Sequence, residues 1–123
     1  MCFRIGTTPA RVKRLKTVYK ILTVSQDELH SPYYGAKYKI GVTKYLPKHL
    51  KRFSDDDNHA HYGLYAFTTL QAAIRWRDMR ASLCSYGIIV KCKVDPKDLL
   101  FVKEDGTEAT YRALTPVERM KHV

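Results

Sequence analysis

Acidic residues are scarce in the first part of the chain. Residues 1–52 contain only Asp27 and Glu28 against twelve Lys and Arg, whereas residues 53–123 contain ten residues of each sign. The formal net charge of +10 therefore lies in the first 52 residues. Because like charges crowded into one region oppose the compact state, this asymmetry indicates a polyanionic partner, either nucleic acid or an acidic protein surface.

Cysteine and long apolar runs are also sparse. The three cysteines, Cys2, Cys84 and Cys92, form no CxxC pair, and an odd number in apolar patterns predicts buried free thiols in a reducing compartment. No 18-residue apolar run occurs, so we expect no membrane span and no membrane partner. Residues 1–6 lack the apolar segment of a secretory signal, and Ser is absent from residues 1–24, unlike in transit peptides. We therefore expect an intracellular protein that is not secreted.

The sequence also lacks the common catalytic and nucleic-acid signatures. There is no GxxxxGK[ST], GxGxxG or GxSxG motif, so we assign no catalytic residue from motifs. No helix-turn-helix, zinc-finger or RNA-recognition pattern occurs, so a nucleic-acid partner would be bound without an implied sequence preference.

The patterns that are present predict one α+β domain with a mostly antiparallel sheet of five or six strands. β-Branched, alternating or buried-type segments predict strands over residues 18–24, 36–42, 63–67, 86–94, 99–103 and 108–114. Thr68-x-x-Gln71 is a capping box that predicts a long helix over residues 69–84. Asp105-Gly106 predicts a hairpin turn. Thr115-Pro116-Val117-Glu118 resembles a second capping box and predicts a short C-terminal helix.

The positive charge is divided between an N-terminal arm and the domain that follows. Residues 1–16 are expected to form a basic arm, either flexible or with one helical turn over residues 10–15, and residues 17–123 form the domain. Tyrosines 19, 33, 34, 38 and 45 alternate with lysines, which suits base stacking beside phosphates. The same pattern also has a structural explanation: the tyrosines pack in the core, and the lysines prevent an exposed edge strand from pairing with another chain. The expected polyanion-binding residues are Arg11, Lys13, Arg14, Lys16, Lys37, Lys39, Lys48, Lys51 and Arg52.

Residues 55–61 contain the ingredients of a metal site. His59 and His61 alternate beside three aspartates. Zinc needs three or four ligands of fixed geometry, and no second His or Cys cluster completes the set. We therefore assign no metal, and keep His59 and His61 only as weak candidates.

The order of segments over residues 18–114 resembles a group of small domains from phages and large DNA viruses. The matching pieces are Val18-Tyr19-Lys20-Ile21-Leu22, Ser31-Pro32, Tyr38-x-x-Gly41, Gly63-Leu64-Tyr65-Ala66-Phe67 followed by the helix with Ala72-Ala73, and Ile88-x-x-Lys91-x-x-Val94-Asp95-Pro96-x-Asp98. The resemblance implies an accessory viral protein, located in the host cytoplasm or nucleus or in the virion. Taken with the charge asymmetry, it favours a small non-enzymatic binding protein. It also leaves open a structural or oligomerising protein packaged in a particle.

The strand Gly63–Phe67 and the helix after it are more remotely similar to the ADP-ribosyltransferase-like fold. That resemblance implies NAD as cofactor, Glu108 as the catalytic carboxylate and Tyr65 as the side chain that stacks on nicotinamide. The family grips the dinucleotide with Arg or His on its first strand, where this chain offers only Lys20. Residues 18–114 are therefore expected to form either an NAD-using enzyme, an inactive relative of that fold, or a binding protein.

Overall fold

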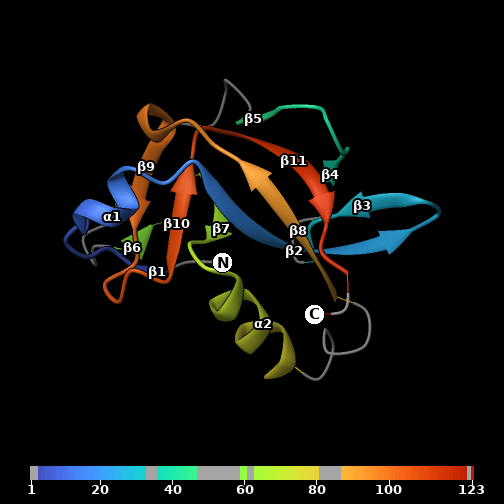
Figure 1. Ribbon diagram of the computed structural model, residues 1–123, viewed down its shortest axis with the longest axis horizontal. Coiled ribbons are helices and arrows are strands. Elements are labelled where there is room, and N and C mark those ends of the chain that lie inside the picture. Colours follow the sequence, from blue (N-terminus) through green and yellow to red (C-terminus); the bar gives the residue numbers. More distant parts are fainter. Residues whose placement is uncertain (1–2, 33–35, 47–58, 61–62, 81–86, 122) are drawn as a thin grey trace.

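The computed structural model describes residues 3–32, 36–46, 59–60, 63–80, 87–121 and 123 (Figure 1). Within these ranges the helical elements are α1 (Ala10–Lys13), α2 (Leu70–Asp78) and the 3-10 turn η1 (Pro96–Asp98). The strands are β1 (Phe3–Arg4), β2 (Thr17–Ser25), β3 (Glu28–His30), β4 (Lys37–Tyr38), β5 (Lys44–Tyr45), β6 (His59–Ala60), β7 (Leu64–Phe67), β8 (Gly87–Lys93), β9 (Leu99–Val102), β10 (Glu108–Tyr111) and β11 (Ala113–Arg119).

Strand β2 lies at the centre of the main sheet. Among the described residues, nine strands form this sheet in the order β5-β11-β8-β2-β7-β10-β9, with β3 paired to β2 and β4 paired to β3. One edge of β2 pairs with β8 from Thr17↔Lys93 to Thr23↔Gly87, and its other edge is shared by β7 and β3. The pairings are antiparallel. The α+β class with a mostly antiparallel sheet is thus confirmed.

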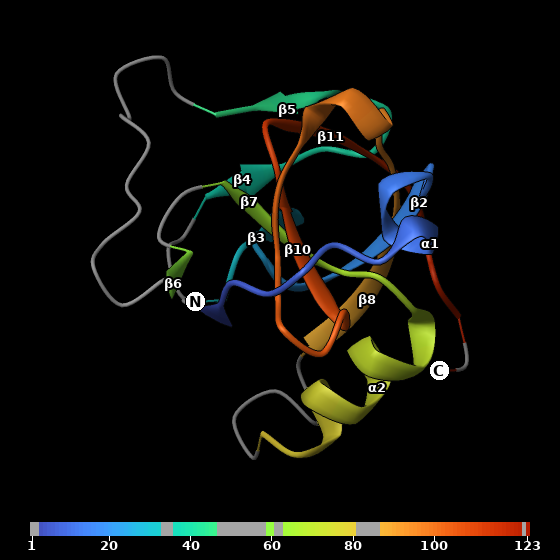
Figure 2. The ribbon, with the colours of Figure 1, turned by 90° about the vertical axis from the view of Figure 1, so that its left-hand side faces the viewer.

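The two faces of β2 carry different hydrophobic clusters, because successive side chains of a strand point to opposite sides. Val18 and Leu22 belong to a large buried cluster that also receives Val12 from α1. Ile21 lies on the other face, in the cluster against which α2 packs through Ala73. The two helices therefore cover different faces of the sheet, and Figure 2 shows α1 and α2 well separated.

The N-terminal segment is paired with the edge of β9. Ile5 forms a β-bridge with Lys103, the Gly6 amide donates to the Val102 carbonyl at 2.9 Å, and the Glu104 amide donates to the Arg4 carbonyl at 2.9 Å. A side chain at Gly6 would collide with the backbone of Glu104, so this close approach requires glycine. Part of the predicted basic arm thus lies along the edge of the main sheet, while β1 itself pairs with β6, and Val12 is only 1% exposed.

The hairpin between β2 and β3 closes on two non-glycine residues. Ser25 pairs with Glu28, and the intervening Gln26 and Asp27 have φ of 53° and 62°. Two consecutive positive φ values fit the type I′ turn that matches strand twist. Gln26 and Asp27 thus both have a left-handed backbone conformation. This conformation destabilises the folded state for residues other than glycine.

The predicted C-terminal helix is wrong, since Thr115 to Glu118 lie within β11. Leu114 and Pro116 are fully buried in the sheet while Val117 is exposed, which is the alternation of a strand. Pro116 is tolerated because the register between β11 and β8 shifts just after it.

Two other boundaries differ from the sequence prediction. Helix α2 ends at Asp78 rather than residue 84, with residues 81–86 outside the described part. Of the strand predicted over residues 36–42, only β4 forms. The main sheet also contains short strands that were not predicted, among them β3 and β5. It therefore has nine strands among the described residues instead of the expected five or six.

Candidate functional sites

The cations of the N-terminal segment are displayed around α1. Pro9 occupies the N-cap of α1, and its carbonyl accepts from the Val12 amide at 3.0 Å. Since Val12 anchors the helix to the core, its charged neighbours are left on the outside. The exposed side chains Arg11, Lys13, Arg14 and Lys16 are called here the α1 cationic surface. Four cations within six residues create a strong local positive potential.

The α1 cationic surface is not neutralised by carboxylates of the described residues. No Asp or Glu in that part of the chain lies within ion-pair distance of its four cations. Other lysines do have such partners, for example Lys37, whose Nζ lies 3.3 Å from the Glu28 carboxylate. As far as the described residues go, the α1 cationic surface thus has no ion-pair partner, and such unpaired cations attract an external anion.

The remaining predicted cations are not brought to α1. Lys37 lies on β4 and Lys39 follows it, and Figure 1 places β3 and β4 at the opposite end of the long axis from α1. Both side chains are exposed. The other three predicted residues, Lys48, Lys51 and Arg52, lie outside the described residues. The six expected cations that lie within the described residues therefore do not form one continuous surface.

An open groove of about 540 Å³ begins at Lys16. Its lining includes Ala113 and Leu114 of β11. Its polar and aromatic lining comes from four places in the sequence, and consists of Lys16, Thr43, Tyr45, Lys93, Asp95, Asp98 and Thr115. Lys93 could not be singled out from the sequence, because its nearness to Lys16 depends on the pairing of Thr17 with Lys93 across β2 and β8.

Tyr45 is the most exposed aromatic side chain of this groove. It lies on β5, opposite Ala113, and 67% of its surface is exposed. Large apolar side chains are exposed at other positions too, but Tyr45 lines a groove that Lys16 and Lys93 also line. A ring in that position offers a face for stacking.

Lys20 is the least expected of the basic residues, because it is buried. Only 7% of its surface is exposed, and it shares a sheet face with Val18 and Leu22. Its Nζ donates to the Tyr65 carbonyl at 2.5 Å and lies 5.0 Å from the centre of the Tyr38 ring. Burial lowers the pKa of Lys20 to about 8, partly opposed by attraction to the Cys92 thiol.

Cys92 and Tyr38 respond to the same environment. Burial raises the pKa of the Cys92 thiol to about 12, with Lys20 acting in the opposite direction. Burial also raises the pKa of the Tyr38 hydroxyl. Cys92 is a free, buried thiol as expected, whereas Cys2 and Cys84 lie outside the described residues. A neutral thiol surrounded by apolar residues is a poor nucleophile.

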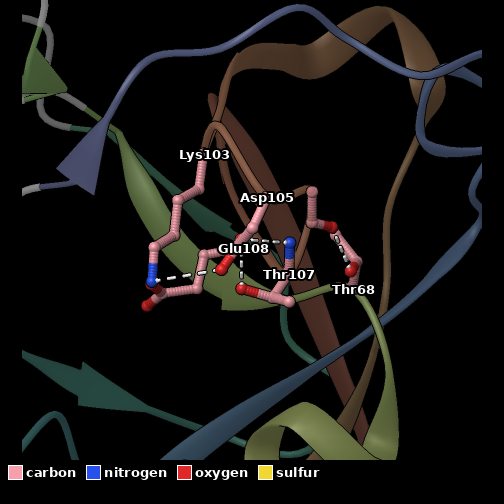
Figure 3. Close-up of polar contacts among 6 residues, drawn as sticks. Thr68, Lys103, Asp105, Thr107 and Glu108 are labelled. Carbon is pink, nitrogen blue, oxygen red and sulfur yellow. Dashed lines mark hydrogen bonds and ion pairs between the residues drawn. The ribbon is translucent and has the colours of Figure 1, made fainter.

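Glu108 lies at the start of β10, beside the hairpin turn (Figure 3). Its carboxylate is 3.3 Å from Lys103 Nζ, and the residue is 4% exposed. Burial raises its pKa, although the positive charge of Lys103 opposes the shift.

The rest of that turn is held by its own side chains. Asp105 accepts from the amide and hydroxyl of Thr107 at 2.9 and 2.6 Å, and Thr68 donates to the Gly106 carbonyl at 2.7 Å. Slight burial raises the pKa of Asp105, but these bonds from Thr107 and the nearby charge of Lys103 lower it overall. The network stiffens the β9–β10 turn around Glu108.

The two residues assigned by the ADP-ribosyltransferase resemblance lie on one face of the sheet. Glu108 is opposite Phe67 and Tyr65 is opposite Thr110 in the pairing of β10 with β7, so their side chains point to the same side. Tyr65 packs edge-on against Phe3, with ring centres 5.7 Å apart. Lys20 points to the other face, so it does not face Glu108.

The described residues contain no group of three or more His, Cys, Asp or Glu arranged to hold a metal ion. His59 lies in β6, where its backbone pairs with Arg4, and His61 lies outside the described residues. In the same part of the chain, no helix is long and apolar enough to cross a membrane.

The resemblances to viral domains and to ADP-ribosyltransferases remain predictions based on short sequence segments. The fold and the positions of charged residues are the observations from which a function can be argued. Comparison of the chain with protein families, with curated proteins and with solved structures found no match.

Proposed function

We propose that this protein is a non-enzymatic nucleic-acid-binding protein that engages phosphates through the α1 cationic surface. The observation that carries the proposal is the group of four exposed cations within six residues that no described carboxylate neutralises. Each lysine or arginine that contacts a phosphate releases condensed counterions, and this release drives association.

The local backbone supports the same conclusion. Val12 anchors α1 in the core, so Arg11, Lys13 and Arg14 project from a backbone of defined position. Arg14 Nε also donates to the Ala10 carbonyl at 3.3 Å, which leaves its other guanidinium nitrogens to bind an anion. Arginine and lysine in one short segment suit phosphate recognition by both forked and point-like donors.

The test is fluorescence anisotropy with a labelled oligonucleotide over roughly 0.05–0.2 M salt. The α1 variant Arg11→Gln/Lys13→Gln/Arg14→Gln is expected to bind more weakly and to show a shallower dependence of log K on log salt. With about 0.7 per phosphate for a single strand, the slope should decrease by about 2.

A matched control removes the same charge elsewhere. Lys37→Gln/Lys39→Gln/Lys121→Gln changes three exposed lysines away from α1, so its salt slope should change much less. Equal losses in the two variants would mean that net charge alone acts, and would refute a binding role for α1. If the native protein binds polyglutamate but no oligonucleotide at low salt, the partner is an acidic protein instead.

A further inference from the structure

We infer that the groove beside α1 binds a base of single-stranded nucleic acid, stacked on Tyr45 with its flanking phosphates on Lys16 and Lys93. This inference rests on the proposed function and specifies its substrate class. The groove volume, about 540 Å³, falls in the range of roughly 300–1,000 Å³ that is typical of sites for small organic groups. A base that has left its stack is such a group, whereas a paired base within a duplex cannot enter.

The aromatic component of the groove is Tyr45. Its side chain is 67% exposed, and its partner across the pairing, Ala113, also lines the groove, so the ring is open to a ligand there. Stacking of a base on an exposed aromatic ring is the main sequence-independent contact of single-strand binders.

The two lysines of the groove extend the α1 cationic surface. Lys16 belongs to both, because it follows α1 and also lines the groove, while the pairing of Thr17 with Lys93 brings Lys93 alongside. In both Figure 1 and Figure 2 the η1 turn lies between β5 and α1. A single strand of nucleic acid whose phosphates contact the cations of α1 would therefore also run past the groove.

The carboxylates of the groove favour a base over a phosphate inside it. Asp95 is engaged by the amide and the ammonium group of Lys97, at 3.0 and 3.6 Å. Asp98 lines the same groove and would repel a phosphate placed at its centre. A carboxylate can instead accept from the amino group of cytosine, as it does in base recognition. Phosphates are thus directed to the lysines at the rim and the base to the interior.

The test compares a labelled oligo-dC strand, the same strand in a duplex with oligo-dG, and free cytidine monophosphate, each titrated against native protein and variants. Tyr45→Ala should weaken binding of the single strand by about 5- to 150-fold and leave duplex binding unchanged. Tyr45→Trp should retain native affinity, because it preserves a stacking face. Unfolding midpoints of both variants should match the native protein, since the side chain is exposed.

The outcomes separate this inference from the proposed function. If Tyr45→Ala leaves single-strand affinity unchanged while Arg11→Gln/Lys13→Gln/Arg14→Gln weakens it, the groove has no role and the α1 proposal stands. If neither variant affects binding, both proposals fail. If cytidine monophosphate binds as tightly as the strand, the ligand is a free nucleotide and the single-strand inference is wrong.

Discussion

The burial of Lys20 predicts that replacing it with methionine stabilises the protein at neutral pH. The pKa of Lys20 is lowered from 10.5 to about 8 by burial. At about 1.4 kcal/mol for each pH unit, the charged amine costs the folded state about 3 kcal/mol. Methionine fills a similar volume without charge, but the substitution also removes the bond from the charged amine to the Tyr65 carbonyl, worth about 1.5 kcal/mol. The expected net gain is about 2 kcal/mol at pH 7.

The pH dependence of this gain follows from proton linkage. Below pH 8 the amine is charged in both the folded and unfolded states, so the full cost is present. Between pH 8 and 10.5 the unfolded state binds more protons than the folded state, so the stability of the native protein rises with pH. The advantage of Lys20→Met should therefore shrink over this interval and disappear near its upper end.

The assay is urea unfolding of both proteins at several pH values from 6 to about 10.5, within the range set by this linkage. Subtracting the two curves removes most of the contribution from Tyr38 and Cys92, which face Lys20 and remain in both proteins. Lys39→Met, an exposed control, should change stability by less than about 0.5 kcal/mol. A Lys20→Met protein that is less stable at pH 7, or whose advantage does not vary with pH, would refute this reasoning.

Two further predictions concern the hairpins. Asp27→Gly should stabilise the protein by about 0.5–1 kcal/mol, because Asp27 has a φ of 62° in the β2–β3 turn, which glycine adopts without strain. Thermal unfolding measures this change. The control Glu28→Gly, in the adjacent strand, should destabilise the protein. Glu108→Gln should be more stable than the native protein at pH 7, because the raised pKa of Glu108 means that its charged form disfavours the folded state. That difference in stability should diminish as the pH falls toward about 4, where the carboxyl becomes protonated in both the folded and unfolded states. A Glu108→Gln protein that is less stable than the native protein at pH 7 would show that the pairing with Lys103 outweighs the cost of burying the charge.

The central strands could be predicted because local pattern and tertiary environment agree there. Residues 18–24 and 87–93 are rich in β-branched side chains, and both lie in the middle of the sheet. The β9–β10 hairpin also followed from Asp105-Gly106, where Gly106 has a φ of 76°.

The remaining elements depend on partners that are distant in sequence. The segment after Leu114 has a helix-start pattern, but burial of Leu114 and Pro116 between neighbouring strands outweighs that local preference. Strand β5 has only Lys44 and Tyr45, and it exists because they pair with β11. Such short strands carry too little pattern to be recognised alone.

For the candidate sites, composition identified the charged segment but not the environment of each side chain. The cations of α1 are exposed as the charge asymmetry suggested, whereas Lys20, counted with them, is in the core. Lys93 could not be associated with Lys16 without the register of β2 and β8. The binding roles of all these residues remain predictions.

The pairing of residues 4–6 with the edge of β9 has a consequence for the entropy of binding. Helix α1 is attached at one end to that pairing and at the other to β2, so its backbone is already ordered in the free protein. A disordered tail with the same cations would lose about 1–2 kcal/mol of backbone entropy for each residue ordered on binding. Because Gly6 permits this attachment, a residue with no side chain would spare the cations upstream of β2 that loss when they meet the anion proposed above.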